Sequence, residues 1–128
     1  MARWTLDLNK YAEKQENKIL EIRKSFLFAL YNSITFRTPI DTGRARGNWN
    51  VSVNSADGAT NENSKSPKYT SVSQMPNNRG DEPLFISNGL DYIERLEYGY
   101  SKQAPNGMVG VTVSSADDTL EEIVRANR

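Results

Sequence analysis

One stretch near the N-terminus decides the fold. It runs from Asp7 to Arg37 as DLNKYAEKQENKILEIRKSFLFALYNSITFR. Apolar and small residues recur along it at steps of three and four, the spacing of one face of an α-helix. This predicted face comprises Tyr11, Gln15, Ile19, Ile22, Phe26, Ala29 and Ser33, with Leu30 and Ile34 beside them. Charges fill the other face of the first half, whereas residues 26–36 are apolar almost all round. The pattern predicts one helix over 7–37, N-capped by Asp7, whose second half is the better buried.

A turn and a strand follow this helix. Thr38-Pro39 ends the helix, because the residue before a proline is pushed out of the α region. The segment 39–43 has turn chemistry, with Pro39 fixing φ, Asp41 able to cap nearby N–H groups and Gly43 able to adopt a positive φ. Residues 48–54 then alternate, which predicts a half-buried strand. One face would carry Trp49, Val51 and Val53, and the other Asn48, Asn50, Ser52 and Asn54.

Residues 55–82 contain almost no aliphatic side chains and many Asn, Ser, Gly and Pro residues. This composition predicts a long mobile loop, which is either functional or disordered. Its only sizeable apolar residues are Tyr69, Val72 and Met75, which would form a hairpin stem or insert into a partner.

Four shorter elements complete the chain. We expect a strand at 84–88, a short amphipathic segment at 90–97, a strand at 109–113 from the alternation of three valines, and a helix at 117–126. The predicted fold is a single α+β domain over 1–128, in which a long N-terminal helix packs on a small antiparallel sheet and a short helix closes the C-terminus.

Composition excludes several kinds of chemistry. The 128 residues include no cysteine and no histidine, so disulfides, thiolate or imidazole metal sites and Cys–His or Ser–His–Asp catalysis are impossible. No apolar run approaches the roughly 20 residues that a membrane span needs. The start also lacks the apolar core of a signal peptide. We therefore expect a soluble protein made in the cytoplasm.

Charge is unevenly distributed although the formal total is zero. Residues 1–47 hold nine Lys/Arg and five Asp/Glu, a net charge of +4, whereas residues 81–128 hold four and nine, a net charge of −5. This split suits head-to-tail contact between identical subunits, and equally suits neutralisation within one fold. The zero total argues against a dedicated nucleic-acid binder.

Three patterns have a chemical and a structural interpretation. Asp41-Thr42-Gly43 matches the triplet of aspartic proteases, which would require a homodimer, but turn chemistry explains all three residues without catalysis, so the protease is a remote alternative. Arg44 and Arg46 form a basic pair that would contact an acidic neighbour or phosphates, or simply face solvent. The carboxylates Asp91, Glu94 and Glu97 would hold a divalent cation or form a solvated stripe, and the nearby tyrosines are packing or interface residues.

Three stretches together resemble a family of small tail-completion or neck proteins of long-tailed bacteriophages, also described as head–tail joining proteins or tail components. They are Leu6–Lys14, the turn and strand start Thr38–Trp49, and the string Leu96–Val109. Their order and spacing fit over nearly the whole chain, and the loop at 55–82 matches least. Gly110 departs from the pattern, since a basic residue is more usual there. The resemblance also implies a final helix from about Pro105, against the strand that alternation predicts at 109–113.

The resemblance implies a non-enzymatic structural subunit of the virion, without cofactor, metal or small-molecule substrate. Such proteins form a ring, a hexamer by family expectation, that completes the tail tube and joins it to the head in the host cytoplasm. The partners would be further copies of the chain, the tail tube protein and head connector proteins, with genomic DNA passing through the lumen without sequence-specific binding. A head-closure stopper or another neck adaptor is the alternative. We predict interface roles for Arg44, Arg46, Trp49, Tyr92, Glu97, Tyr98, Tyr100 and Lys102.

Overall fold

The computed structural model describes residues 8–40, 43–78, 82–99, 103–104 and 106–127. Its elements follow the order α1 (Leu8–Arg37), a 3-10 turn η1 (Arg46–Asn48), β1 (Trp49–Val53), a 3-10 turn η2 (Val72–Gln74), β2 (Leu84–Asn88), α2 (Ile93–Glu97), α3 (Val109–Ser114) and α4 (Ala116–Ala126). The α+β class and the long N-terminal helix are confirmed. The predicted N-cap, Asp7, lies outside the described residues.

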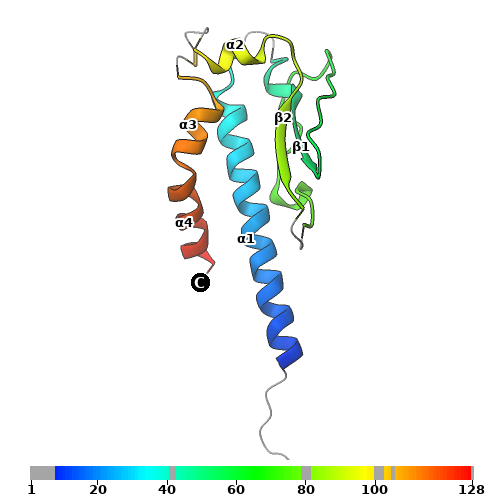
Figure 1. Ribbon diagram of the computed structural model, residues 1–128, viewed down its shortest axis with the longest axis vertical. Helices are drawn as coiled ribbons and strands as arrows, with labels where there is room; N and C mark the ends of the chain where they lie inside the picture. The colour runs from blue at the N-terminus through cyan, green and yellow to red at the C-terminus, as the bar shows by residue number, and fades with distance from the viewer. Residues whose placement is uncertain (1–7, 41–42, 79–81, 100–102, 105, 128) are drawn as a thin grey trace, which may run out of the picture.

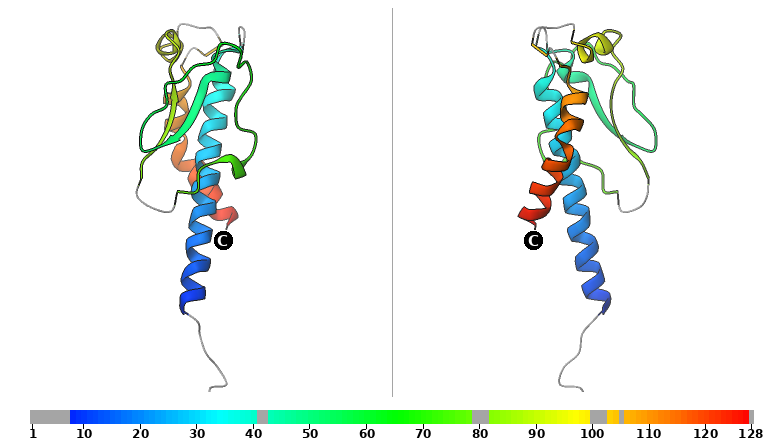
Figure 2. Two further views of the ribbon diagram at one scale, coloured as in Figure 1. Left: turned by 90° about the vertical axis from the view of Figure 1, so that its right-hand side faces the viewer. Right: turned by 60° about the vertical axis from the view of Figure 1, so that its left-hand side comes forward.

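Helix α1 is the central element of three layers (Figure 1). The β1–β2 ribbon lies on one side of α1, and α3 and α4 lie on the other. The short α2 crosses the end of the molecule where α1 stops, and the first half of α1 projects beyond the body at the opposite end (Figure 2). We call the end where α1 stops the turn end. Among the described residues, no helix is both long and apolar enough to cross a membrane.

The sheet has two antiparallel strands. Trp49 pairs with Asn88 and Val53 with Leu84, so the 30 residues between the strands form an excursion that leaves and returns at one end of the ribbon. Asn54 turns the chain out of β1 with a φ of 74° and donates its N–H to the carbonyl of Pro83 at 2.9 Å. A two-stranded ribbon is marginal on its own, so its stability depends on packing against α1.

The core joins the second half of α1 to the sheet and to the segment that leads into α3. Its hub is Tyr31, which is fully buried and meets the ring of Tyr69 edge-on, with 5.0 Å between the ring centres. Burial raises the pKa of the Tyr31 hydroxyl above its usual 10.0, although the N–H groups of Tyr69 and Lys68 donate to it and act in the opposite direction. The other buried members of this cluster are Ile34, Trp49, Ala104 and Met108.

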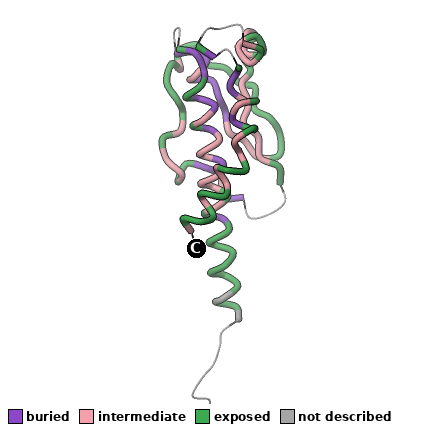
Figure 3. Tube along the Cα trace, turned by 90° about the vertical axis from the view of Figure 1, so that its left-hand side faces the viewer, coloured by how far each residue is buried: buried purple, intermediate pink, exposed green. Residues whose placement is uncertain are grey.

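The helix is buried on a different face from the predicted one. Its buried residues are Leu20, Leu27, Tyr31, Ile34 and Thr35, whereas Ile19 is 51 % exposed. The described side chains from Asn9 to Ile19 are all exposed, which confirms that the second half is the better buried (Figure 3). The predicted face missed Tyr31 because residues 26–36 are apolar nearly all round, so periodicity alone does not select the side that meets the sheet.

The predicted strand at 109–113 is wrong, because these residues belong to α3. Alternation would place Val109, Val111 and Val113 on one face, but Val113 is 64 % exposed and Thr112 is buried instead. The Thr112 hydroxyl lies 2.7 Å from that of Ser33 on α1. A carboxylate twelve residues earlier binds the first N–H groups of α3, as described below, and this contact outweighs the strand preference of valine.

Candidate functional site

The turn after α1 is fastened to the start of β1 by a chain of buried hydrogen bonds. The Trp49 indole N–H donates to the Thr38 hydroxyl oxygen at 2.9 Å, and that hydroxyl donates to the Ile34 carbonyl at 2.6 Å. Thr38 is fully buried and Trp49 is 4 % exposed. Trp49 is therefore a residue of this chain's own core, where a buried indole N–H needs such a partner.

Arg46 closes the end of α1. Its Nε donates to the Thr38 carbonyl at 2.8 Å, and one terminal nitrogen donates to the Phe36 carbonyl at 2.7 Å. Its guanidinium carbon lies 5.8 Å from the centre of the Phe36 ring. The last carbonyls of a helix lack helical partners and carry partial negative charge, so a guanidinium is well suited to them. The structure thus gives Arg46 an intramolecular role.

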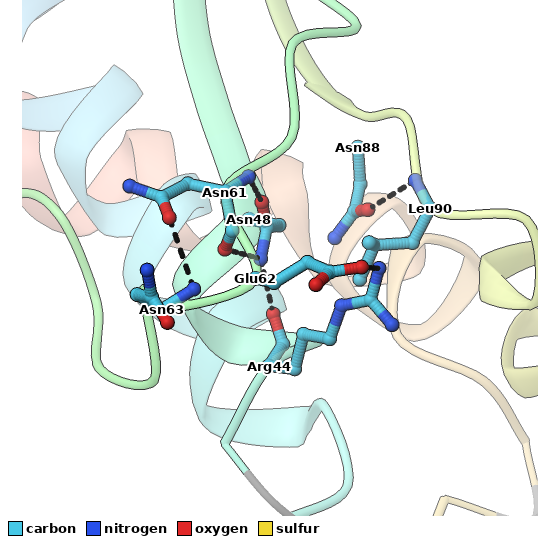
Figure 4. Close-up of polar contacts among 7 residues, drawn as sticks. All are labelled: Arg44, Asn48, Asn61, Glu62, Asn63, Asn88 and Leu90. Atoms are coloured by element: carbon cyan, nitrogen blue, oxygen red, sulfur yellow. Dashed lines mark hydrogen bonds and ion pairs between the residues drawn. The ribbon is translucent and has the colours of Figure 1, made fainter.

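Arg44 lies at the base of the loop (Figure 4). A terminal nitrogen lies 3.5 Å from a carboxylate oxygen of Glu62, and the guanidinium carbon lies 5.9 Å from the centre of the Tyr92 ring. Because Glu62 is largely exposed, this ion pair contributes little to stability. Arg44 and Tyr92, both predicted as interface residues, contact each other within the chain.

Two asparagines of the predicted polar strand face are buried, and they hold the loop. The Asn48 amide donates to the carbonyls of Arg44 at 2.8 Å and Asn61 at 3.1 Å, and its oxygen accepts the Asn61 N–H at 2.7 Å (Figure 4). The Asn50 amide donates to the carbonyls of Asp57 at 2.8 Å and Ala59 at 3.0 Å. Backbone groups of the loop thus take the place of water on this face of the strand.

Close backbone packing also ties the loop down. A side chain at Gly47 would lie 2.2 Å from the Ser64 carbonyl oxygen, and the Ser64 hydroxyl donates to the Gly47 carbonyl at 2.7 Å. Further along, Met75 is 3 % exposed and Tyr69 packs on Tyr31. The apolar residues predicted to form a hairpin stem or to enter a partner therefore pack within their own chain. The mobility of the loop as a whole stays a prediction.

The Glu97 side chain caps the N-terminus of α3. One carboxylate oxygen accepts the N–H groups of Met108 at 2.9 Å and Val109 at 2.7 Å, and the other accepts that of Gly110 at 2.9 Å. Burial acts to raise the pKa of Glu97, but the three N–H donors outweigh it and lower the pKa below its usual 4.5. Glu97 was predicted as an interface residue, and its carboxylate is engaged inside the protein.

The remaining predicted residues divide into exposed ones and ones outside the described residues. Tyr98 is 86 % exposed at the end of α2. Tyr100, Lys102 and the Asp41 of the protease-like triplet lie outside the described residues. Gly43 has a φ of 81°, as the turn prediction requires. Across the described part of the chain, no group of acidic residues is placed to hold a metal ion, and Glu97 points into α3 rather than toward Asp91 and Glu94.

The turn end leaves apolar side chains in solvent. Phe36 is 80 % exposed and Ile40 is 54 % exposed, both of which sequence reasoning missed. The Ile40 N–H donates to the side-chain oxygen of Gln103 at 2.8 Å. A pocket of about 360 Å³ opens beside them, lined by Phe36, Arg37, Thr38, Pro39, Arg46, Gln103, Ala104, Asn106, Gly107 and Val111. We call Phe36, Ile40 and this pocket the apical surface.

Comparison with known proteins does not identify a relative. No family model matches the chain, no curated protein matches it, and no solved structure matches it.

Proposed function

We propose that this chain is a structural subunit of the neck of a long-tailed bacteriophage. In this proposal it forms a ring of identical copies that completes the tail tube and joins it to the head. One observation carries the proposal: two of the stretches that resemble neck proteins, Thr38–Trp49 and Leu96–Val109, fold together into one surface. The hydrogen bond between Ile40 and Gln103 joins them, and they line one pocket.

At the turn end, some side chains stabilise the fold and others are exposed, and this arrangement supports a docking role rather than catalysis. Arg46, Trp49 and Glu97 hold the turn end together from inside. Phe36 and Ile40 are large apolar side chains left in solvent, and such side chains beside a pocket are typical of protein contact sites. Docking on a preformed surface avoids much of the ordering cost of binding, which suits a subunit that must close a ring on a template.

The partners in this proposal are further copies of the chain, the tail tube and the head connector, with DNA passing through the ring without sequence-specific contacts. A head-closure or other neck adaptor role is the nearest alternative. The two roles differ in the particles formed when the protein is missing. Loss of a tube terminator gives overlong tails, whereas loss of a head-closure protein leaves tails of normal length beside heads.

Electron microscopy of particles assembled without this chain tests the proposal. We expect filled heads beside unattached tails, with overlong tails if the chain ends tube growth. Intact infectious particles would exclude a neck function. Complementation then tests the apical surface: Phe36→Glu with Ile40→Glu should fail to restore attachment, whereas Val113→Glu, an exposed valine on α3, should restore it.

Charge reversal at Arg44 and Arg46, the basic pair predicted to lie at an interface, is a poor test of joining. Arg46→Glu would place a carboxylate against the carbonyls of Phe36 and Thr38 at the negative end of α1. Loss of attachment would then report a damaged fold as readily as a lost contact. The apical variants remove no hydrogen bond made by a side chain, because Phe36 and Ile40 are exposed apolar residues, and circular dichroism of each variant checks that it still folds.

A further inference from the structure

The first half of α1 is a helix without cover. Its described side chains from Asn9 to Ile19 are all exposed, and this part projects beyond the body (Figures 1 and 3). Isolated helices shorter than about 12–15 residues are marginal in water. The projecting segment is continuous with a buried helix, which supports its C-terminal end. A second surface along its side would stabilise the segment further.

The chemistry of this segment defines the surface that fits it. Lys10, Lys14 and Lys18 are exposed and recur at steps of four, so they form one stripe along the helix. From Leu8 to Lys24 there are five basic and three acidic residues, a net charge of +2. The described side chains of the projecting part include few apolar atoms to bury. The charge of the stripe therefore favours an acidic surface.

The chain carries such a surface on α4. Four carboxylates occupy its first two turns, and all four are exposed. With Arg125 the helix has a net charge of −3. Asp118 and Glu122 are four residues apart, as the lysines of the stripe are, so the two rows repeat at the same distance of about 6 Å along their helices. The acidic residues of α4 are Asp117, Asp118, Glu121 and Glu122.

We propose that the lysine stripe, Lys10, Lys14 and Lys18, docks on the acidic face of α4 in a second copy of this chain. The contact joins two different surfaces, so every copy keeps one of each for the next neighbour and the assembly can close by rotation. The inference deepens the proposed ring and rests on it for closure. The pairwise contact itself rests on the exposure and charge of the two helices.

Charge swapping tests the contact in purified protein. One variant carries Lys14→Glu and Lys18→Glu, and the other carries Asp118→Lys and Glu122→Lys. Sedimentation at low ionic strength should show self-association of the wild type, weakened about tenfold or more in either variant alone. In a mixture of the two variants both joints between unlike copies are attractive, because one pairs the swapped charges and the other pairs the original ones, so the mixture should associate again. Lys65→Glu, an exposed lysine in the loop, is the matched control and should associate like the wild type.

A cross-link places the contact. The chain has no cysteine, so Lys14→Cys in one copy and Glu122→Cys in another introduce the only thiols. Oxidation of the mixture should give a disulfide-linked dimer of twice the chain mass, and Lys65→Cys with Glu122→Cys should not.

Three outcomes would overturn the inference: a wild type that stays monomeric at low salt, association unaffected by either swap, or a mixture that does not recover. Circular dichroism of each variant shows that loss of association is not loss of folding. The proposed neck function fails separately, through intact particles made without the chain. If copies associate through this contact but particles made without the chain are intact, the interface is supported and the neck function is excluded.

Discussion

The two halves of α1 belong to one helix but have different roles. From Leu20 onward it carries Tyr31, Ile34 and Thr35 into the core. Before Leu20 every described side chain is exposed. Burial of apolar area is the main source of folding free energy, so the second half stabilises the fold and the first contributes little. The exposed side chains of the first half face solvent, where they can contact other molecules, whereas those around the second half serve the fold.

The largest expected effect lies beside the buried half. Trp49→Ala should lower the free energy of unfolding by about 3–5 kcal/mol, because it leaves a cavity and removes the donor to Thr38. Urea denaturation followed by circular dichroism measures this loss. Tyr98→Ala, at a side chain 86 % exposed, is the control and should change stability by no more than about 0.5 kcal/mol. Equal losses in the two variants would contradict the division between fold and surface.

The next effect concerns the loop. Asn48→Ala should cost about 1–3 kcal/mol, because backbone groups of Arg44 and Asn61 lose their buried partners. Limited proteolysis should cut residues 55–68 faster in this variant than in the wild type. Asn63→Ala keeps the backbone N–H that donates to Asn61, so the protease should cleave its loop at the wild-type rate. A loop cleaved equally fast in all three would show that Asn48 does not restrain it.

A smaller, pH-dependent effect is expected at Glu97. Its pKa is lowered in the folded state, so its contribution to stability is complete above the usual value of 4.5 and is lost as pH falls through the lower folded value. Glu97→Gln should cost about 1–2 kcal/mol at pH 7, because the negative charge at the start of α3 is lost and the amide NH2, a donor, cannot replace the carboxylate oxygen that it displaces. The difference between the two proteins in free energy of unfolding, measured by urea denaturation, should narrow toward pH 3. A constant gap would show that the carboxylate charge is not what stabilises α3.

The smallest effect is expected on the projecting half. Lys14→Ala should change the free energy of unfolding by less than about 0.5 kcal/mol, because an exposed lysine contributes little to folding. Hydrogen exchange sharpens the same point: amides between residues 12 and 18 should exchange far faster than those between 27 and 34. At concentrations where copies associate, the difference in exchange rate between the two groups of amides should become smaller. Slow exchange along the whole helix in the monomer would mean that the two halves are equally stable.

The sequence predicted the elements better than the contacts. The long helix, both strands and the closing helix follow from periodicity and turn residues, which act locally. The error at 109–113 arose because Glu97, twelve residues before Val109, settles that segment through a contact that no local pattern encodes. The interface roles stay a prediction, but the sequence did not show that Arg46 and Glu97, which look like surface charges, bind backbone groups of their own chain.

Some of the missed residues did leave a signal. Asparagine is disfavoured in strands, so Asn48 and Asn50 flanking Trp49 were out of place for a solvent-facing strand, and their burial against the loop explains them. Phe36 and Ile40 flank the turn, but a large apolar residue in sequence does not show whether it packs or protrudes. Whether Phe36 and Ile40 pack or protrude depends on where α3 and the turn lie in the folded chain.

The uninterrupted backbone of α1 has a mechanical consequence. The twelve residues from Leu8 to Ile19 extend about 18 Å at the usual rise of an α-helix, with no break where they leave the body. They form a lever arm whose root is fixed in the core, at the start of the buried half that runs on to the apical surface. A tilt of about 10° at the root moves the tip by about 3 Å over that length. A force on the tip is therefore transmitted as torque to the turn end, which makes the two ends of the molecule mechanically one piece.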